Sequence, residues 1–399
     1  MVIYKACMTM INILHISNTD IKVDSRICKE LNALSELSGV QIFVVGIPQN
    51  NEVGEIDLLG AKYLKLRLVS RRLKLLPRAI RYFFELIEFT YKTVMGSRRI
   101  TPSIVHCHDT FALPAGWIIK MTLGCQLVYD AHELESNKNA QNAMLSYSTL
   151  LIEKFCWKQV DLLISVSDSI TDWYMRNLGN KSSVLILNTP VIAEDVASDL
   201  DVQGPGNYFH KRYLIPTDNL VFVYLGILGP GRGIEICLDA FAEGPKDAHV
   251  VFIGFGPFER KIIDHAERHT NIHFHQAVPH DQVVPLVRSA DYGLCLVENV
   301  SLSDFYCLPN KLFEYCFARL PVLASSFPEI SRMVEKYSLG VCCNPDRDSV
   351  RTALGLLTGR RPTRPTSDIT ALSWETQASR LRSVYQNQLM TPNGVQPVH

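Results

Sequence analysis

Two patterns of hydrophobic residues alternate along most of the chain. Short apolar runs such as Ile11–Ile16 are each followed by a polar loop and then by a segment whose apolar residues recur every three or four positions. After the first run these positions are Ile27, Leu31, Leu34 and Leu37. A short apolar run is typical of a buried strand, and the longer spacing is typical of a helix that packs by one face. Repeated strands and helices in this order predict parallel sheets with helices on both faces.

The alternation occurs in two series, which predicts two doubly wound α/β domains. The further strands expected in the first series are Val40–Gly46, Ile104–His108, Gln126–Tyr129, Leu162–Val166 and Ser183–Leu187. Those expected in the second are Leu220–Leu225, Val250–Ile253, Ile272–Phe274, Tyr292–Val297 and Val322–Ala324. Between the series the pattern breaks into prolines, an acidic stretch and Gly204-Pro205-Gly206, which is typical of a linker. We therefore predict a first domain at 1–190, a linker at 191–216, a second domain at 217–368, and a helix within 369–391 that crosses back to the first domain.

Length and composition agree with two domains that have large cores. The chain has 399 residues, of which 47% are hydrophobic and 20% charged, and this balance excludes extensive disorder. Its 40 basic and 40 acidic residues cancel, so no overall field marks a nucleic-acid-binding protein and we expect no such partner. No apolar run approaches the roughly 18 to 20 residues that span a bilayer. We interpret the N-terminus as a first strand and not as a signal peptide, with Met8 and Met10 as alternative start positions.

The eleven cysteines are scattered along the chain and include no Cys-x-x-Cys pair. They predict neither a disulfide framework nor a zinc site, and they fit a reducing cytoplasm.

One segment, residues 62–99, departs from the neutral average. It holds eleven Lys or Arg residues against two Glu residues, interleaved with leucines, isoleucines and aromatic residues. We expect a basic amphipathic pair of helices that lies in the headgroup layer of an anionic membrane leaflet. The residues expected to contact the membrane are Arg71, Arg72, Lys74, Arg78 and Arg81. The alternative is a solvated basic face whose apolar side packs on the sheet.

The stretch Leu308–Tyr315 combines a helix start with three polar side chains. Pro309 suits the first helical position, so the free N–H groups of the first turn would face whatever precedes the helix and would favour an anion. Asn310 and Glu314 are four residues apart and share one face of the helix, with Lys311 beside them. The same stretch also fits an ordinary helix cap with an exposed polar pair.

Three histidines end or follow predicted strands, at the edge where open α/β sheets bind their ligands. His106 and His108 lie two residues apart, so their side chains are on one side of the strand. They have no third ligand nearby in the sequence, so we expect packing or hydrogen bonding there and no metal. His132 follows the strand that ends at Tyr129 and is the better candidate for a functional residue, although a lone histidine at such a position is more often structural.

Several linked motifs resemble those of the GT-B glycosyltransferases, specifically the retaining family 4 of the glycosyltransferases group 1 type. The resemblance covers nearly the whole chain, and the order and spacing of the motifs are more specific than any one of them. The motifs are Asp24-Ser25-Arg26-Ile27, His106-x-His108-Asp109, Tyr129-Asp130-Ala131-His132-Glu133-Leu134, Asn188-Thr189-Pro190, Tyr224-Leu225-Gly226 with Arg232-Gly233, Phe252-Ile253-Gly254-x-Gly256-Pro257, Pro309 to Tyr315, and Leu320-Pro321-Val322. The resemblance implies two Rossmann-like domains facing across a cleft, with the acceptor on the side of the first and a nucleotide-sugar donor bound mainly by the second.

The resemblance also implies a chemistry. A sugar moves from a nucleoside diphosphate to a hydroxyl acceptor with retained anomeric configuration, without a cofactor and without a metal. Negative charge then builds on the departing diphosphate, where fixed cations and backbone N–H groups stabilise it. By resemblance the catalytic residues are Arg232 and Lys311 near the diphosphate and His132 at the donor sugar, and Glu314 binds the ribose. The other residues expected at the donor are Asn310, Gly226, Gly254 and Gly256.

The chain departs from the family at three positions. Many relatives carry a cation where Ile227 stands, a glutamate where Tyr306 stands, and a helix-ending glycine where Arg319 stands. Because one of two phosphate cations is missing, Lys311 is the candidate replacement. The departures also keep open a second interpretation, a catalytically silent relative that binds a nucleotide sugar or a partner glycosyltransferase.

Two other enzyme classes fit less well. A metal-dependent transferase of the other common fold would need Asp-x-Asp just after an apolar strand, but Asp199-x-Asp201 lies in the expected linker. Asp346-Arg347-Asp348 resembles a turn that leads into a helix. A dehydrogenase would need a third glycine where Glu259 stands.

The basic segment at 62–99 bears on the acceptor. It favours a lipid-linked or saccharide acceptor, as in cell-surface polysaccharide or glycolipid assembly. We accordingly expect a cytoplasmic protein that is peripheral on the inner face of the cell membrane.

Overall fold

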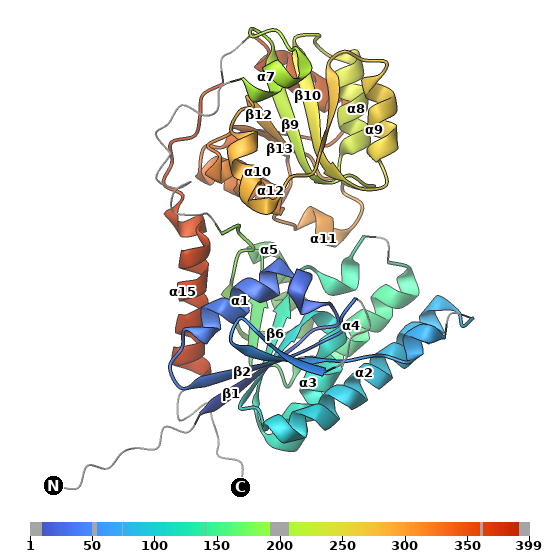
Figure 1. Cartoon of the computed structure of the whole chain (residues 1–399), viewed down its shortest axis with the longest axis vertical. Coiled ribbons are helices and arrows are strands. Elements are labelled where there is room, and N and C mark those ends of the chain that lie inside the picture. The colour runs from blue at the N-terminus through green and yellow to red at the C-terminus, as the bar shows by residue number, and fades with distance from the viewer. Residues whose placement is uncertain are drawn as a thin grey trace, which may run out of the picture. The chain divides into compact units, whose positions relative to one another are not determined.

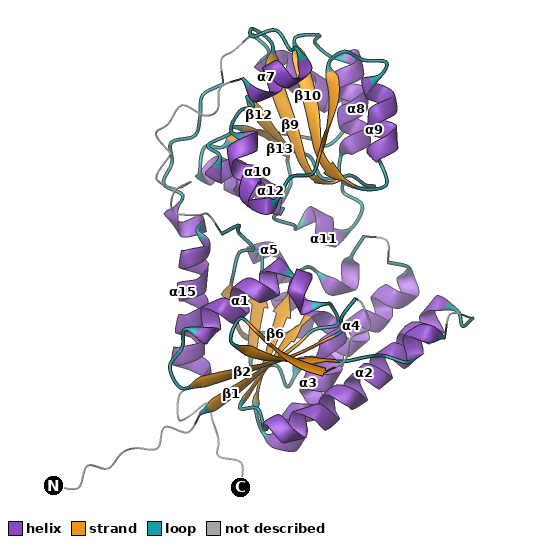
Figure 2. Cartoon of the chain, viewed as in Figure 1, coloured by secondary structure: helices purple, strands orange, loops and turns teal. Residues whose placement is uncertain are grey.

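The chain forms two compact units, which this computed structural model describes over residues 10–49, 54–73, 75–139, 141–191, 207–359 and 362–390. Unit 1 comprises Met1–Leu187 and Glu375–His399, and unit 2 comprises Asn188–Trp374. Each unit is an α/β domain built on one sheet, as the alternating pattern predicts (Figures 1 and 2). The C-terminal helix belongs to unit 1, although all of unit 2 precedes it in the sequence.

The sheet of unit 1 contains eight described strands in the order β3-β4-β2-β1-β5-β6-β7-β8. Neighbouring strands are parallel except for β3 and β4, an antiparallel pair at one edge. The strands are β1 (Ile11–Ile16), β2 (Val40–Gly46), β3 (Gly54–Leu58), β4 (Ala61–Lys65), β5 (Ile104–His108), β6 (Gln126–Ala131), β7 (Leu162–Ser165) and β8 (Ser182–Leu185). β5 and β7 are buried at every position, as expected for strands covered on both faces.

Helices cover both faces of this sheet (Figure 1). On the face covered by α1 and α15, the Tyr385 hydroxyl contacts His106. On the face covered by α2 to α5, Glu153 accepts a hydrogen bond from Tyr129. The helices are α1 (Ser25–Ser35), α2 (Arg78–Ile100), α3 (Asp109–Leu123), α4 (Ala143–Trp157), α5 (Asp168–Leu178) and α15 (Trp374–Val384), which continues into a π-helical segment at Tyr385–Leu389. Short 3-10 turns lie at Ile21–Val23, Ser70–Arg72 and Glu135–Asn137.

The sheet of unit 2 contains six described strands, all parallel, in the order β11-β10-β9-β12-β13-β14. They are β9 (Leu220–Ile227), β10 (Ala248–Phe255), β11 (Ile272–Gln276), β12 (Tyr292–Cys295), β13 (Val322–Ser325) and β14 (Gly340–Cys343). The helices are α7 (Tyr208–Tyr213), α8 (Ile234–Glu243), α9 (Glu259–Ala266), α10 (His280–Val287), α11 (Leu302–Phe305), α12 (Asn310–Phe317), α13 (Pro328–Lys336) and α14 (Arg347–Leu357). A 3-10 turn lies at Thr370–Leu372.

Helix α12 is fixed to the sheet of unit 2 by Tyr315. The Tyr315 hydroxyl donates a hydrogen bond to the carbonyl of Val223 in β9 at 3.0 Å. Its ring lies against Gly293 of β12, where a Cβ atom would approach the ring to 2.6 Å. Because Gly293 has no side chain, the ring of Tyr315 can pack directly against β12. This contact sets the position of α12.

Residues 62–99 form different elements from the expected pair of amphipathic helices, so that prediction was wrong. Residues 61–65 form strand β4, which lies between β2 and the edge strand β3, and the α-helix of this segment begins only at Arg78. In β4 the side chain of Tyr63 is buried and that of Lys62 is exposed, which is the alternation of a strand. The dense positive charge concealed this short alternation. Strands β3 and β14 were likewise not predicted.

Two boundaries are also clearer in the structure. Pro309 is the N-cap of α12, with φ −68° and ψ 141°, and the helix begins at Asn310, so Pro309 does not occupy the first helical position. Most of the expected linker, residues 192–206, lies outside the described residues. Asp346 caps α14 with its carboxylate, as the turn-to-helix pattern predicts.

Within the described part of the chain, no helix combines the length and apolarity needed to cross a bilayer. The ten cysteines that the structure describes are free thiols.

Candidate active site

A buried polar cluster lies at the carboxyl ends of the central strands of unit 1. β1 contributes His15, β5 contributes His106 and His108, and β6 contributes Asp130. Parallel pairing sets His15 beside His106 and His108 beside Asp130, so all four side chains share the face covered by α1 and α15. All four are fully buried. Buried titratable groups require partners, and the cluster finds most of them within the unit, although the Nε2 atoms of His15 and His106 have no hydrogen-bond partner among the described residues.

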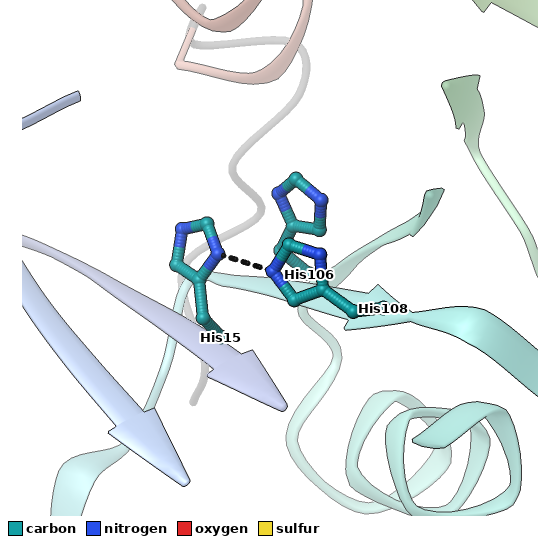
Figure 3. Close-up of side chains that lie close together, drawn as sticks. All are labelled: His15, His106 and His108. Carbon is teal, nitrogen blue, oxygen red and sulfur yellow. Dashed lines mark hydrogen bonds between the residues drawn. The ribbon is translucent and has the colours of Figure 1, made fainter. Parts of the chain in front are cut away.

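The three imidazoles form a stack (Figure 3). Ring centroids lie 4.4 Å apart for His15 and His106 and 4.3 Å apart for His106 and His108, with planes inclined by 29° and 20°. Nδ1 of His15 lies 3.0 Å from Nε2 of His108, and Nδ1 of His106 lies 2.7 Å from the Tyr385 hydroxyl. Burial lowers the pKa of His106 to about 3 and also lowers the pKa values of His15 and His108. The stack is therefore uncharged near neutral pH.

The stack fits a metal ion poorly, although its nitrogen atoms lie close together. An imidazole binds zinc through a lone pair in its ring plane at about 2.0–2.1 Å, and nearly parallel stacked rings do not direct their lone pairs to one point. A second possible ligand set combines Glu30 and Asp130 with His106 and His108. Its two carboxylates already face the guanidinium of Arg26, which supplies the cation. The expectation that the protein needs no metal stays a prediction.

Arg26 of α1 holds the charge of this cluster in place. Its Nη2 lies 2.9 Å from Oδ1 of Asp130, its Nε lies 3.1 Å from Oε1 of Glu30, and its Nη1 donates to the carbonyl of Ile186. Although burial favours the neutral acid, Arg26 and His132 hold the pKa of Asp130 well below its ordinary value. Burial and the charge of Asp130 raise the pKa of Glu30 to about 8. Asp130 is thus the carboxylate ion of the cluster, and Glu30 is protonated at neutral pH.

His132 follows β6 and is the partly exposed member of the cluster, with 17% of its side chain accessible. Its Nε2 lies 3.0 Å from Oδ2 of Asp130 and 3.2 Å from Nδ1 of His108. Its Nδ1 lies 3.7 Å from Oδ1 of Asp109. Burial opposes a charge here, but the two carboxylates outweigh it and raise the pKa of His132 to about 10. His132 is therefore an imidazolium near neutral pH, suited to donate hydrogen bonds to oxygen and unsuited to act as a base.

Asp109 reaches His132 through a strained backbone. It begins α3 with φ 61°, a backbone conformation that residues other than glycine rarely adopt. Its carboxylate accepts a hydrogen bond from the backbone N–H of His132 at 3.3 Å. Such strain costs on the order of 1–3 kcal/mol and is concentrated at functional sites. Here it places a second carboxylate beside the imidazolium.

In unit 2, the glycines expected at the donor allow the carboxyl ends of β9 and β10 to approach each other closely. Gly254 has φ 154°, and a Cβ atom on it would lie 1.9 Å from the carbonyl oxygen of Gly226. A Cβ atom on Gly256, with φ 148°, would lie 2.4 Å from the carbonyl oxygen of Leu228. Only glycine fits these two positions. Gly226 itself, with φ 125°, has open space where a side chain would stand, so its backbone remains accessible.

Arg232 lies in the loop between β9 and α8, and its side chain is exposed. Glu298 holds this loop, because its Oε1 accepts a hydrogen bond from the N–H of Gly233 at 3.0 Å and its own N–H donates to the carbonyl of Gly231. Arg232 is close enough to Asp304 to oppose the rise in the pKa of Asp304 that burial causes. The loop thus presents Arg232 at the carboxyl end of β9.

Helix α12 begins at the same edge of the sheet, because β12 neighbours β9. No side chain caps its first turn, in which Asn310 is exposed. Glu314, one turn further on, is 8% exposed, and its Oε1 lies 3.8 Å from Nδ1 of His280. The start of a helix favours negative charge, so this edge suits an anionic ligand.

Lys311 of α12 lies inside the unit. Its ammonium is 3.6 Å from the centroid of the Tyr224 ring, and its Nζ is buried with no hydrogen-bond partner among the described residues. A desolvated cation over an aromatic ring gains roughly 2 kcal/mol, whereas burying an ion costs several kcal/mol. The Tyr224 hydroxyl is also buried without such a partner. Unit 2 therefore contains a buried cation that none of its described side chains neutralises.

The three departures from the family take definite positions. Ile227, where relatives carry a cation, ends β9 with 55% of its surface exposed. Tyr306 is half-buried and directly follows α11 in the sequence. Arg319 has φ 54°, the left-handed conformation that favours glycine, and its Nη1 donates to the carbonyl of Ser367 at 2.5 Å.

The arginines expected at a membrane lie in the turn before α2 and at the start of α2. Arg71 and Arg81 both pair with Glu85, at 3.6 and 3.4 Å, and Arg72 is exposed. Lys74 lies outside the described residues, and Arg78 is the first residue of α2. Exposed ion pairs of this kind contribute little to stability.

Several residues of the unit 1 cluster lie in the sequence motifs, but the sequence analysis did not predict that they form a cluster. Arg26 and Asp130 stand in two of the motifs that carry the family resemblance, yet neither was predicted to be a site residue. The available signal was His15, a titratable residue inside the first buried strand, since burial there demands a partner. Glu30 and Tyr385 give no such signal, because only the fold brings them to the cluster.

Comparison with known proteins adds two family models, which together match both units. Residues 25–200 match the glycosyl transferase 4-like domain, and residues 219–358 match the glycosyl transferases group 1. Comparison with curated proteins gives no match.

Solved structures of similar fold cover nearly the whole chain. Sucrose-phosphate synthase from Thermosynechococcus elongatus matches with a TM-score of 0.72 at 16% identity, over 94% of this chain and 98% of that one. HepE from Anabaena, in complex with UDP-glucose, matches with a TM-score of 0.64 at 12% identity, over 94% and 99%. A glycosyltransferase from Rickettsia africae matches with a TM-score of 0.64 at 11% identity, over 96% and 99%.

The structural similarities establish the fold, and the two family models establish the kind of domain that each unit contains. The resemblance drawn from the linked motifs is thereby confirmed. The chain belongs to the GT-B glycosyltransferases, with a glycosyl transferase 4-like domain followed by a group 1 domain.

Proposed function

We propose that this protein transfers a sugar from a nucleoside-diphosphate-sugar to a hydroxyl acceptor with retention of the anomeric configuration. The observation that carries the proposal is the buried ammonium of Lys311, which has an aromatic ring beside it but no described carboxylate. Arg232 and the uncapped start of α12 lie at the same edge of the sheet. A diphosphate would supply the negative charge that these groups lack. The structure of HepE with UDP-glucose supports a nucleotide sugar as the ligand class.

Each residue has a definite task in this proposal. Arg232 and Lys311 stabilise the charge that develops on the departing diphosphate. A preorganised group of this kind is worth about 10²–10³ in rate for Arg232, and a hydrogen bond to a charged group is worth about 10–10² for Lys311. Glu314 accepts hydrogen bonds from the ribose hydroxyls. The imidazolium of His132 donates a hydrogen bond to the donor sugar. The exposed amide of Asn310 and the glycines complete the donor site: Gly226, Gly254 and Gly256.

We further propose a lipid-linked or saccharide acceptor, as in cell-surface polysaccharide or glycolipid assembly, and a location on the inner face of the cell membrane. The exposed basic turn before α2 supports this proposal. We expect the reaction to need neither a metal nor a cofactor, so a chelator should leave turnover unchanged.

A second candidate function is a catalytically silent relative that binds a nucleotide sugar or a partner glycosyltransferase. Ile227 favours it, because an exposed apolar side chain stands where many relatives carry a phosphate-binding cation.

A thermal-shift panel of UDP, GDP, ADP and their sugars, followed by a release assay, tests both functions. Ligand at a hundredfold excess over its Kd stabilises a protein by about 2.7 kcal/mol, so the correct nucleotide should raise Tm clearly. The transferase should also release nucleoside diphosphate from the matching donor, slowly to water and faster to an acceptor. Binding without any release would favour the silent relative. The absence of a shift with every nucleotide would contradict both.

A further inference from the structure

Helix α2 exposes its apolar residues to solvent. The apolar side chains that are at least partly accessible on its outer face recur at helical spacing: Ile80, Phe83, Phe84, Ile87, Tyr91 and Met95. Phe83 and Tyr91 are 58% and 63% exposed. A helix on the surface of a soluble domain normally turns a polar face outward. The outer face of α2 is therefore built for contact with something apolar.

Both acidic residues of α2 are held away from this face. Glu88 accepts hydrogen bonds from the N–H groups of Val69 and Ser70 and pairs with Lys92 at 2.6 Å. Glu85 pairs with Arg71 and Arg81, as described above. The exposed charged side chains that the structure describes on α2 are Arg98 and Arg99.

Helix α4 repeats this arrangement independently. Its outer face exposes Met144, Tyr147, Leu151 and Phe155 at helical spacing. The exposed charged residue of the helix is Lys154, and its one carboxylate, Glu153, is buried. Oε1 of Glu153 accepts hydrogen bonds from Tyr129 and Tyr174 on the inner side. α4 therefore also presents an outer face of apolar and basic residues without acidic ones.

Helix α3 joins the two faces. It lies between α2 and α4 on the same side of the sheet (Figure 1). Phe89 of α2 packs on Phe111 of α3 at 5.3 Å between ring centroids, and Trp117 of α3 packs on Phe155 of α4 at 4.9 Å. Met121 of α3 adds a further exposed apolar side chain. We call the exposed apolar and basic residues of these three helices the α2–α4 face.

We infer that the α2–α4 face is a membrane-binding surface, whose apolar side chains enter the headgroup region of a bilayer rich in anionic lipid. Large exposed apolar side chains gathered on adjacent helices mark a site of interaction. The charge decides the partner, because the exposed charged groups of α2 and α4 in the described structure are all basic, which suits anionic headgroups. Tyr91 and Tyr147 add phenol groups, which are favoured at the membrane interface. A second copy fits less well, since a two-fold contact would oppose two basic faces.

This inference deepens the proposed function, on which it rests for its purpose: the face would hold unit 1 beside a lipid-linked acceptor. It also changes which residues make the contact. The sequence predicted a basic amphipathic segment at 62–99 with contacts through arginines around the start of α2, whereas the face inferred from the structure consists mainly of apolar side chains and extends over α3 and α4. α4 has no counterpart in that prediction.

Sedimentation of the full-length protein with vesicles tests the inference. Vesicles of phosphatidylcholine mixed with phosphatidylglycerol should bind the protein, and phosphatidylcholine alone should bind it weakly. Phe83→Gln and Phe155→Gln should each weaken binding by about tenfold, the effect of losing one inserted aromatic side chain. R98Q/R99Q should weaken binding to the anionic vesicles only. Leu356→Gln, at a similarly exposed residue of unit 2, is the matched control and should change nothing.

Three results would overturn the inference. These are the absence of binding to either kind of vesicle, binding that neither phenylalanine variant weakens, and a dimer in solution that Phe83→Gln and Phe155→Gln convert to monomer. A loss of binding in Phe83→Gln alone would remove α4 from the surface and overturn the two-helix contact. Release of nucleoside diphosphate is measured on the same variants without vesicles, where it should match wild type. Vesicle binding without any release by the wild type would refute the proposed function and leave the membrane surface standing.

Discussion

The two units treat buried charge in opposite ways. In unit 1, Arg26 and His132 face the carboxylates of Asp130 and Asp109, so each of these charges has a partner of opposite sign within the unit. In unit 2, the buried ammonium of Lys311 has a ring beside it and no described carboxylate. Because buried charge needs compensation, the charges of the unit 1 cluster balance one another, whereas the charge of Lys311 would be balanced by an anion.

The difference separates charged groups that already have counter-charges in the folded unit from one that has none among the described residues. His132 is fixed as a cation by two carboxylates before anything binds, which is the preorganisation that catalysis favours. In the proposed function, an incoming diphosphate provides the counter-charge for Lys311 and Arg232.

The largest effect is expected from the loss of Asp130. Asp130→Ala leaves the charges of Arg26 and His132 poorly compensated inside unit 1 and should lower the free energy of unfolding by about 3–5 kcal/mol. Urea denaturation measures the loss. Asp172→Ala is the control, because Asp172 pairs with Arg176 on the surface and its removal should cost far less. If Asp130→Ala lowered the free energy of unfolding as little as Asp172→Ala, the cluster would not be a network of mutually compensating charges.

Arg232→Ala should slow release of nucleoside diphosphate by about 10²–10³-fold, because it removes one preorganised cation from the developing charge. Its Tm should stay at the wild-type value, since the side chain is exposed. Arg260→Ala, in the neighbouring helix α9, removes an exposed arginine of the same unit that pairs with Asp264 and should leave turnover unchanged. Wild-type turnover in Arg232→Ala would remove this residue from the site.

Lys311→Met keeps a long side chain over Tyr224 and removes the charge. The free energy of unfolding should hold or rise, because an uncompensated buried charge is lost. Turnover should fall about tenfold to a hundredfold, the value of a hydrogen bond to a charged group. Lys336→Met is the control, since Lys336 lies over the Tyr337 ring on the surface of α13. A variant that loses stability but keeps turnover would show that Lys311 is a structural cation.

Asp109→Asn should lower the pKa of His132, which Asp109 and Asp130 together raise to about 10. The folded-state pKa exceeds the ordinary 6.5, so the charge of His132 stabilises the fold fully below pH 6.5, and this contribution is lost as pH rises through about 10. In the variant, this contribution should be smaller, and its loss should be complete at a lower pH. NMR titration of the imidazole measures the shift, which should be a unit or more. An unchanged titration would mean that Asp130 alone sets the charge.

The sequence predicted most of the fold because buried strands and one-sided helices leave periodic traces. The short strand β4 left a weaker trace, which dense positive charge obscured. The polar cluster of unit 1 could not be assembled from the sequence, since Arg26, His106, Asp130 and Tyr385 come from four separate elements that only the fold brings together.

The candidate donor site shows the same limit. Helical spacing predicted that Asn310 and Glu314 share one face of α12, but it could not predict that Lys311 lies over Tyr224. That contact depends on how α12 sits on β9, which the ring of Tyr315 and the space at Gly293 determine. Sequence can identify a cation near a helix start, whereas its compensation is a property of the packed domain.

The rate of nucleoside diphosphate release decides whether Arg232 and Lys311 act as catalytic cations. It should be measured with the nucleotide sugar that raises Tm, on the wild type, Arg232→Ala and Lys311→Met side by side. We predict release by the wild type and a loss of at least tenfold in both variants, with folding retained in each. Release at wild-type rates by both folded variants would contradict the claim that unit 2 uses these two cations to stabilise a departing diphosphate.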